Sequence, residues 1–149
     1  MKMLERLEHK CKSLGLTFRH ENMSSTKIDC YINDIPIQCK YRGPKNSGRG
    51  YNYPIYTRKK ISKKISKHGY TAYSESDPFV FMIAEIGGPP ENPFMYNGNF
   101  IILSKKLLIE RGVLSTVETK GKGSCMICPP DSDKDHWSKP YWNRFDLLK

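Results

Sequence analysis

Residues 27–42 have the sequence KIDCYINDIPIQCKYR, and this stretch decides the fold. Apolar and polar residues alternate on either side of Asn33-Asp34, which is the pattern of two short strands over 27–32 and 35–42. Asn and Asp tolerate the left-handed backbone that a two-residue hairpin turn requires. The sequence therefore predicts a tight β-hairpin at this position.

The predicted hairpin gathers three polar side chains on one face. Its register places Asp29 opposite Gln38 and Lys27 opposite Lys40. The opposite face carries apolar residues that we expect to pack on the core: Ile28, Cys30, Ile37 and Cys39. Magnesium prefers oxygen ligands, keeps several waters and needs only one or two protein carboxylates. Asp29, Gln38 and Lys40 thus predict a metal site, although an ordinary hairpin with a solvated face has the same alternation.

The net charge of the chain is concentrated in one segment. Lysine and arginine number 25 against 15 acidic residues, giving +10, and no acidic residue occurs between Ile35 and Ser74. That segment holds ten cations and six of the nine tyrosines, a composition typical of nucleic-acid binding. A solvated basic face and a patch for anionic membranes are the alternatives. We expect DNA contacts from Arg42, Lys45, Arg49, Arg58, Lys59, Lys60, Lys63, Lys64 and Lys67.

The hairpin resembles that of a known nuclease family. Asp29 is followed after eight residues by Gln38-Cys39-Lys40, which is similar to the PD-(D/E)XK motif in its QxK variant. The resemblance covers residues 1–41, and it implies an α/β, restriction-endonuclease-like fold with a mixed β-sheet core flanked by helices in αβββαβ order. The glutamine variant is known among small, basic homing endonucleases of this fold.

The resemblance also implies roles for individual residues. Asp29 and the Cys39 carbonyl would bind Mg²⁺, with Mn²⁺ able to substitute, and Glu5 of the first helix would complete the site, with Glu8 as second choice. Lys40 would orient or help deprotonate the attacking water. Gln38 is neutral where the family usually has an acid, so the site should hold metal more weakly or hold fewer ions.

The remaining elements follow from local patterns. We expect one domain over 1–149, with a helix plus catalytic hairpin at 1–42, a basic DNA-binding segment at 43–74 and a capping or interface tail at 120–149. The expected elements are a helix over 3–14 ended by Gly15, a strand over 16–20, a loop over 43–56, a helix over 58–67, buried strands over 79–86 and 100–103, a helix over 105–111 capped by Ser104, a loop over 120–135 and an apolar tail over 137–148.

Five cysteines, an odd number, and a charged N-terminus without a signal peptide favour reduced thiols inside the cell, in cytoplasm or nucleus, and no membrane association. Cys125 and Cys128 form a CxxC pair with His136 nearby. Zinc is not expected there, because no second closely spaced pair exists. We expect His136 to be a solvated loop residue rather than a general base.

These observations favour a metal-dependent, site-specific DNA endonuclease, most similar to a homing endonuclease. Cutting both strands of a duplex with one site per chain implies a homodimer or a higher homo-oligomer. A restriction or junction-resolving nuclease is the first alternative. A non-catalytic DNA- or RNA-binding module is the second.

Overall fold

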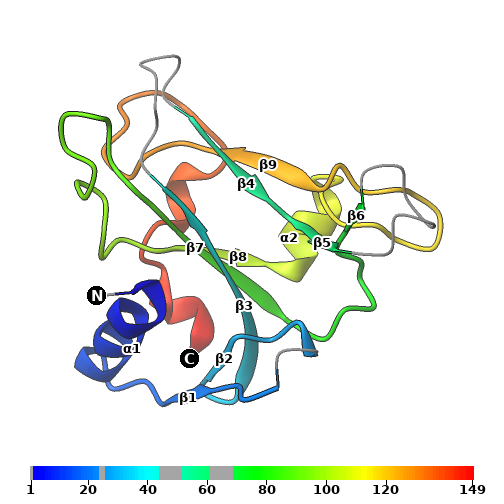
Figure 1. Ribbon diagram of the computed structural model, residues 1–149, viewed down its shortest axis with the longest axis horizontal. Coiled ribbons are helices and arrows are strands. Elements are labelled where there is room, and N and C mark those ends of the chain that lie inside the picture. Colours follow the sequence, from blue (N-terminus) through cyan, green and yellow to red (C-terminus); the bar gives the residue numbers. More distant parts are fainter. Residues whose placement is uncertain (1, 24–25, 44–51, 61–68) are drawn as a thin grey trace.

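A five-stranded mixed sheet forms the centre of the protein. The computed structural model describes residues 2–23, 26–43, 52–60 and 69–149 (Figure 1). The strand order is β1-β2-β3-β7-β8; β3 and β7 run parallel and the other neighbours antiparallel. The strands are β1 Phe18–His20, β2 Cys30–Ile32, β3 Ile35–Arg42, β7 Phe81–Ile86 and β8 Ile101–Ser104. The mixed α/β fold class expected from the sequence is confirmed.

The central hairpin has the predicted turn and register. Asn33 and Asp34 both have positive φ, 50° and 66°, and Ile32 pairs with Ile35 across the turn. The predicted first strand is too long, however: β2 begins only at Cys30. The pairing expected for Lys27 is not formed, because Lys27 itself has a φ of 61° and leaves the strand.

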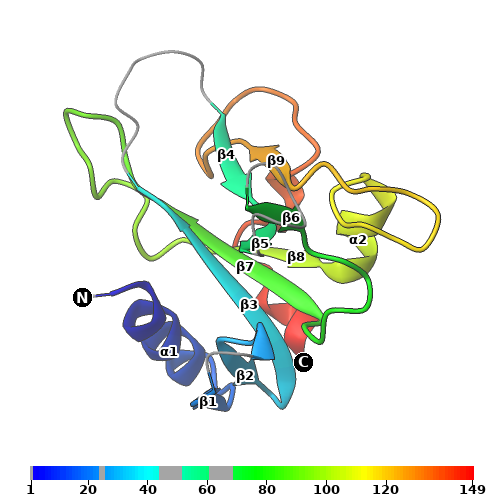
Figure 2. The same ribbon diagram turned by 45° about the vertical axis from the view of Figure 1, so that its right-hand side comes forward.

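Further elements cover both faces of this sheet (Figure 2), and a cluster of buried hydrophobic residues lies on each face. On one face lie α1 (Met3–Ser13) and the C-terminal 3-10 turn Phe145–Leu148, which pack on strand residues such as Ile37 and Ile83. On the other lie α2 (Lys105–Glu110) and a two-stranded sheet of β4 (Tyr53–Tyr56) and β9 (Ser124–Ile127). The candidate functional side chains of β3 point toward this second face.

Several local signals lead to the expected elements. The apolar run over 79–86 forms the buried strand β7, and the Oγ of Ser104 accepts the N–H of Leu107 at 3.1 Å as the α2 cap. The first helix is likewise followed by Gly15, which has a φ of 74°. These elements form as expected because apolar runs and caps are local features of the sequence.

Three predicted segments are wrong in part. Residues 58–60 form a strand, β5 (Arg58–Lys60), paired with β6 (Tyr70–Ala72), where a helix was expected; residues 61–67 lie outside the described part of the chain. The expected loops over 43–56 and 120–135 contain β4 and β9.

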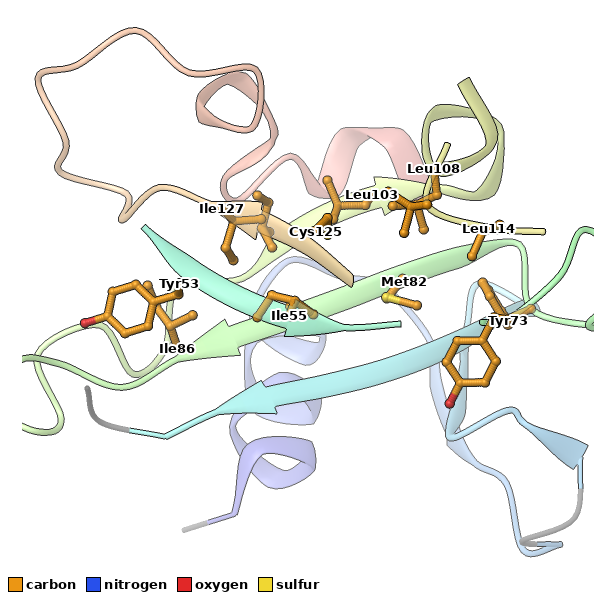
Figure 3. Packing of buried hydrophobic residues seen from close by; sticks show 14 residues of the cluster. Tyr53, Ile55, Tyr73, Met82, Ile86, Leu103, Leu108, Leu114, Cys125 and Ile127 are labelled. Atoms are coloured by element: carbon orange, nitrogen blue, oxygen red, sulfur yellow. The ribbon is translucent and has the colours of Figure 1, made fainter. Parts of the chain in front are cut away.

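The β4–β9 pairing explains this last difference. Tyr53 pairs with Ile127 and Ile55 with Cys125, and all four side chains are buried together (Figure 3). Each strand has only four residues within a segment rich in turn-forming residues, so neither is recognisable alone. Burial against β7 and β8 is what stabilises the pair.

The C-terminal segment packs against the core. Phe145 and Leu148 are buried, and the Trp142 indole donates to the Cys128 carbonyl at 2.9 Å.

All five cysteines are free thiols. Within residues 2–23, 26–43, 52–60 and 69–149, no helix has the length and apolarity that crossing a bilayer requires.

An ion pair with a fully buried carboxylate connects α1 to the sheet. The carboxylate of Glu85 on β7 is 0% exposed, and it accepts the Arg6 Nε–H at 2.8 Å and the Gly98 N–H at 2.7 Å. A second bond from Arg6 Nη2 makes the pair bidentate. This contact sets the position of the helix against the sheet.

Candidate functional site

The candidate site lies where β2 separates from β3. The Asp29 N–H donates to the Ile37 carbonyl at 2.8 Å, and its carboxylate Oδ2 accepts the Cys39 N–H at 2.7 Å. The Asp29 side chain thus replaces a ladder bond at the edge of β3. Its other oxygen, Oδ1, accepts no hydrogen bond from the described residues. Asp29 is therefore held firmly at one oxygen, which leaves the second for a ligand.

Gln38 and Lys40 point to the face opposite α1. Gln38 pairs with Met82 and Lys40 with Ala84 in the parallel ladder, and both β7 partners belong to the core on the β4–β9 side. Gln38 is 7% exposed and lines a pocket of about 400 Å³ together with Asp29 and Tyr73. The predicted shared face for Asp29 and Gln38 therefore corresponds to one wall of a real pocket.

Tyr73 lies next to Asp29, Gln38 and Lys40, and the sequence pattern does not indicate it as a site residue. The Lys40 Nζ donates to the Tyr73 Oη at 2.9 Å and lies 4.8 Å from the ring centroid. The ring packs edge-on against Phe79 at 5.4 Å. Figure 3 places Tyr73 at the margin of the core cluster, with its hydroxyl directed away from the aliphatic side chains. The only sequence signal for Tyr73 was its membership of the six tyrosines in the basic segment.

The pKa values at this site follow from burial. Burial lowers the pKa of Lys40 below the usual lysine value, and the nearby Asp29 carboxylate partly opposes that shift. Burial, and then the charges of Asp29 and Asp77, raise the pKa of Tyr73 to about 12. Tyr73 therefore remains a neutral hydroxyl near neutral pH, while Lys40 releases its proton more easily than an ordinary lysine.

The glutamates of α1 do not join this pocket. α1 covers the opposite face of the sheet, and Leu4 is its residue that lines the pocket. Glu8 instead contacts Lys12 at 2.9 Å and His20 at 3.1 Å, and these hydrogen bonds lower the pKa of Glu8. Glu5 is exposed. Arg6 and Leu7 are the residues of α1 that contact the sheet, and a role for Glu5 or Glu8 beside Asp29 stays a prediction.

The donor set fits a weakly held, largely hydrated magnesium ion. Asp29 offers one carboxylate oxygen and Gln38 an amide oxygen, while the Cys39 carbonyl accepts a weak bond from Gln38 Nε2 at 3.4 Å. The part of the chain that the structure describes contains no group of three or more His, Cys, Asp or Glu side chains suited to a metal. Mg²⁺ is held by one or two protein carboxylates together with waters and substrate phosphates, so Asp29 could supply the protein carboxylate of such a site.

One cysteine of the CxxC pair, Cys128, makes contacts with other parts of the chain. The buried Cys128 Sγ accepts the Ser138 hydroxyl at 3.4 Å, and His136 Nδ1 lies 2.7 Å from the same hydroxyl. Burial and the nearby Arg111 lower the pKa of His136. Ser138 therefore connects Cys128 with His136 in a structural role.

The basic segment divides into distinct environments. Arg58 and Lys60 are exposed, whereas Lys59 Nζ is paired with the buried Asp77 carboxylate at 2.8 and 3.1 Å. Arg42 lies over the Tyr56 ring at 5.6 Å. The other predicted DNA contacts lie outside the described residues: Lys45, Arg49, Lys63, Lys64 and Lys67.

Comparison by sequence finds no matching family model and no matching curated protein. Comparison of structures does find a likeness. The structure of a bacterial homing endonuclease, I-Ssp6803I, matches with a TM-score of 0.67 over 98% of this chain and 87% of that chain, at 14% identity. The chain has a homing-endonuclease-like fold. The structure of MepB matches with a TM-score of 0.57 over 95% of this chain and 96% of that chain, at 15% identity.

Proposed function

We propose that this protein is a metal-dependent, site-specific DNA endonuclease of the homing type. The main support for this proposal is that Asp29, Gln38 and Lys40 lie around Tyr73, in a fold similar to that of a homing endonuclease. The roles proposed for these residues follow from their resemblance to the PD-(D/E)XK motif in its QxK form. The charge of the segment that follows the hairpin supports a polyanionic substrate.

Each of these groups would have a separate role in phosphodiester hydrolysis. Asp29, the Cys39 carbonyl and the Gln38 amide would hold Mg²⁺ or Mn²⁺, which when bound supplies Lewis-acid polarisation of the phosphate. Lys40 would orient the attacking water, take up its proton in the neutral form and offset charge on the phosphate in the ammonium form. Tyr73 holds the Lys40 nitrogen in place. In-line hydrolysis would leave a 5′-phosphate and a 3′-hydroxyl.

The described part of the chain has one such site, so cleavage of both strands would use a homodimer or a higher homo-oligomer on a roughly palindromic target. Such a duplex target also distinguishes this proposal from a junction-resolving enzyme, which would recognise the shape of branched DNA.

The test is cleavage of a complex duplex library with Mg²⁺ or Mn²⁺, followed by mapping of the cut ends. Asp29→Asn is the matched variant, because its amide oxygen still accepts the Cys39 N–H while the charge is lost. We expect discrete cuts from the natural protein and none from the variant. No cuts with either metal, or the same cuts from Asp29→Asn, would refute the enzymatic function and leave a binding module.

Two adjacent lysines should contribute in different ways to DNA binding. Lys60→Met removes an exposed charge, so we expect weaker DNA binding and a salt dependence reduced by about one unit of slope. Lys59→Met breaks the contact with buried Asp77, so we expect stability to fall by about 1–3 kcal/mol with little effect on affinity. Fluorescence anisotropy against salt and urea unfolding measure the two effects. Equal losses of affinity in both variants would contradict this division.

A further inference from the structure

A second pocket adjoins the candidate site on the far side of Lys40. Its volume is about 480 Å³, and its lining residues are Lys40, Tyr56, Arg58 and Tyr70. Tyr56 ends β4, Arg58 begins β5 and Tyr70 begins β6. Arg58 pairs with Ala72 and Lys60 with Tyr70, so Arg58 and Tyr70 project from the same face of their hairpin. Among the described residues, no acidic side chain lines this pocket.

Arg58 is held by rings in this pocket. Its guanidinium carbon lies 4.3 Å from the Tyr56 ring centroid and 5.6 Å from that of Tyr70. Both rings are exposed, at 42% and 50%. Among the described carboxylates, none forms an ion pair with Arg58, in contrast to the neighbouring Lys59. Stacking uses the flat face of a guanidinium and leaves its in-plane N–H donors for an anion.

The local charge also favours an anion. Arg42 lies over the same Tyr56 ring at 5.6 Å, so two guanidinium groups share one aromatic side chain. Lys40 adds a third cation at the pocket wall. Three cations near one open pocket repel each other unless an anion binds between them.

Lys40 connects this pocket to the candidate site. It lines the second pocket, and its Nζ is bonded to Tyr73, which lines the first pocket with Asp29 and Gln38. The two pockets are therefore adjacent and share the Lys40–Tyr73 pair as their boundary. A strand whose scissile phosphate lies beside Asp29 would bring its next phosphate toward Arg58.

We propose that the pocket of Lys40, Tyr56, Arg58 and Tyr70 binds the backbone phosphate adjacent to the scissile one, with Arg58 as its fixed, bidentate ligand. The inference rests on the proposed function, because it takes DNA as the polyanion. The tyrosine rings hold the guanidinium in place before DNA arrives, so the fork loses little freedom on binding.

The first experiment measures affinity for duplex DNA without divalent metal, so it does not depend on cleavage. We expect Arg58→Ala to weaken binding about tenfold or more and to lower the salt slope by about one. Arg58→Lys keeps the charge and therefore the slope, but we expect most of the affinity loss to remain. Tyr56→Leu should weaken binding in the same way, whereas Tyr56→Phe should retain it.

Arg111 provides the matched control. It is also an exposed arginine stacked on an aromatic ring, with its guanidinium carbon 4.1 Å from the Trp137 centroid, and it lies outside both pockets. Arg111→Ala and Arg111→Lys should bind DNA like the natural protein.

The second experiment locates the phosphate. Single methylphosphonates are placed in turn around the mapped cut, and each duplex is bound to the natural protein and to Arg58→Ala. We expect one position, next to the cut, at which the neutral linkage weakens binding to the natural protein but no longer affects Arg58→Ala. A uniform response at every position would overturn the inference and leave a diffuse basic surface.

The failures of the two proposals are distinguishable. If the protein cuts DNA through Asp29 but Arg58→Ala binds and cuts like the natural protein, this inference alone is wrong. If the natural protein binds no DNA, both proposals are wrong. Arg58-dependent binding to phosphatidylserine vesicles without DNA binding would likewise overturn the inference and assign the pocket to a membrane headgroup.

Discussion

Replacing Lys40 with alanine is expected to slow single-turnover cleavage about 10²–10⁴-fold, the usual loss for a positioned acid–base group. DNA affinity should fall about tenfold or less, because one of many phosphate contacts is lost. Both quantities are measured on the mapped target, by quenched-flow cleavage with metal and by anisotropy without it. Cleavage by Lys40→Ala at the natural rate would show that Lys40 lies outside the reaction.

The pH dependence should reveal which protonation state of Lys40 acts. Burial lowers the pKa of Lys40, so the neutral amine forms at a lower pH than for an ordinary lysine, and the rate should rise with pH through that value. Lys40→Arg keeps the charge but does not titrate in this range, so its rate should lose this rise.

Tyr73→Phe gives the same experiment a second readout. The variant retains the ring that packs on Phe79 but loses the oxygen that accepts the Lys40 ammonium hydrogen bond. Loss of that bond disfavours the charged form, so the pKa of Lys40 should fall further and the inflection should move to lower pH. An inflection that moves upward, or a natural rate independent of pH, would contradict a proton-accepting role for Lys40.

The largest effect on stability is expected from the buried pair between α1 and β7. Arg6→Met keeps the length of the side chain but leaves the fully buried Glu85 carboxylate with only the Gly98 N–H. Breaking one partner of a buried pair exposes the full desolvation cost of the other charge. We expect the free energy of unfolding to fall by about 3–5 kcal/mol in urea titrations followed by circular dichroism.

The double variant Arg6→Met/Glu85→Gln tests the cause. Glutamine still accepts the Gly98 N–H but carries no charge, so much of the lost stability should return. Arg144→Met, which breaks the exposed pair with Asp146, serves as the control and should have a far smaller effect. A double variant no more stable than Arg6→Met would show that packing, rather than the unpaired charge, is the cause.

The candidate site was predictable where its geometry is local. Asp29, Gln38 and Lys40 could be placed near one another from the alternation of the hairpin and from a turn of two residues that tolerate positive φ. The residues that surround these three side chains could not be predicted from the sequence. Tyr73 is 33 residues from Lys40 in sequence, and no spacing rule indicates such a contact.

The position of α1 illustrates the same limit. A helix pattern indicates which residues are apolar, but not which face of a sheet the helix will cover. The pair of Arg6 with Glu85, 79 residues apart, joins α1 to β7, and no spacing in the sequence indicates this contact. Lys59, one of the residues predicted to contact DNA, likewise forms an ion pair with Asp77, 18 residues further along the chain.

The amino-acid sequence alone determined the hairpin, its turn, the buried strand β7 and the capped helix α2, because each depends on interactions between residues close in the chain. The tertiary structure decided the β4–β9 pairing, the β5–β6 strands, the position of α1 and the two pockets on either side of Lys40 and Tyr73. Those features depend on contacts between distant segments, whose stability comes from burial that exists only once the whole chain has folded.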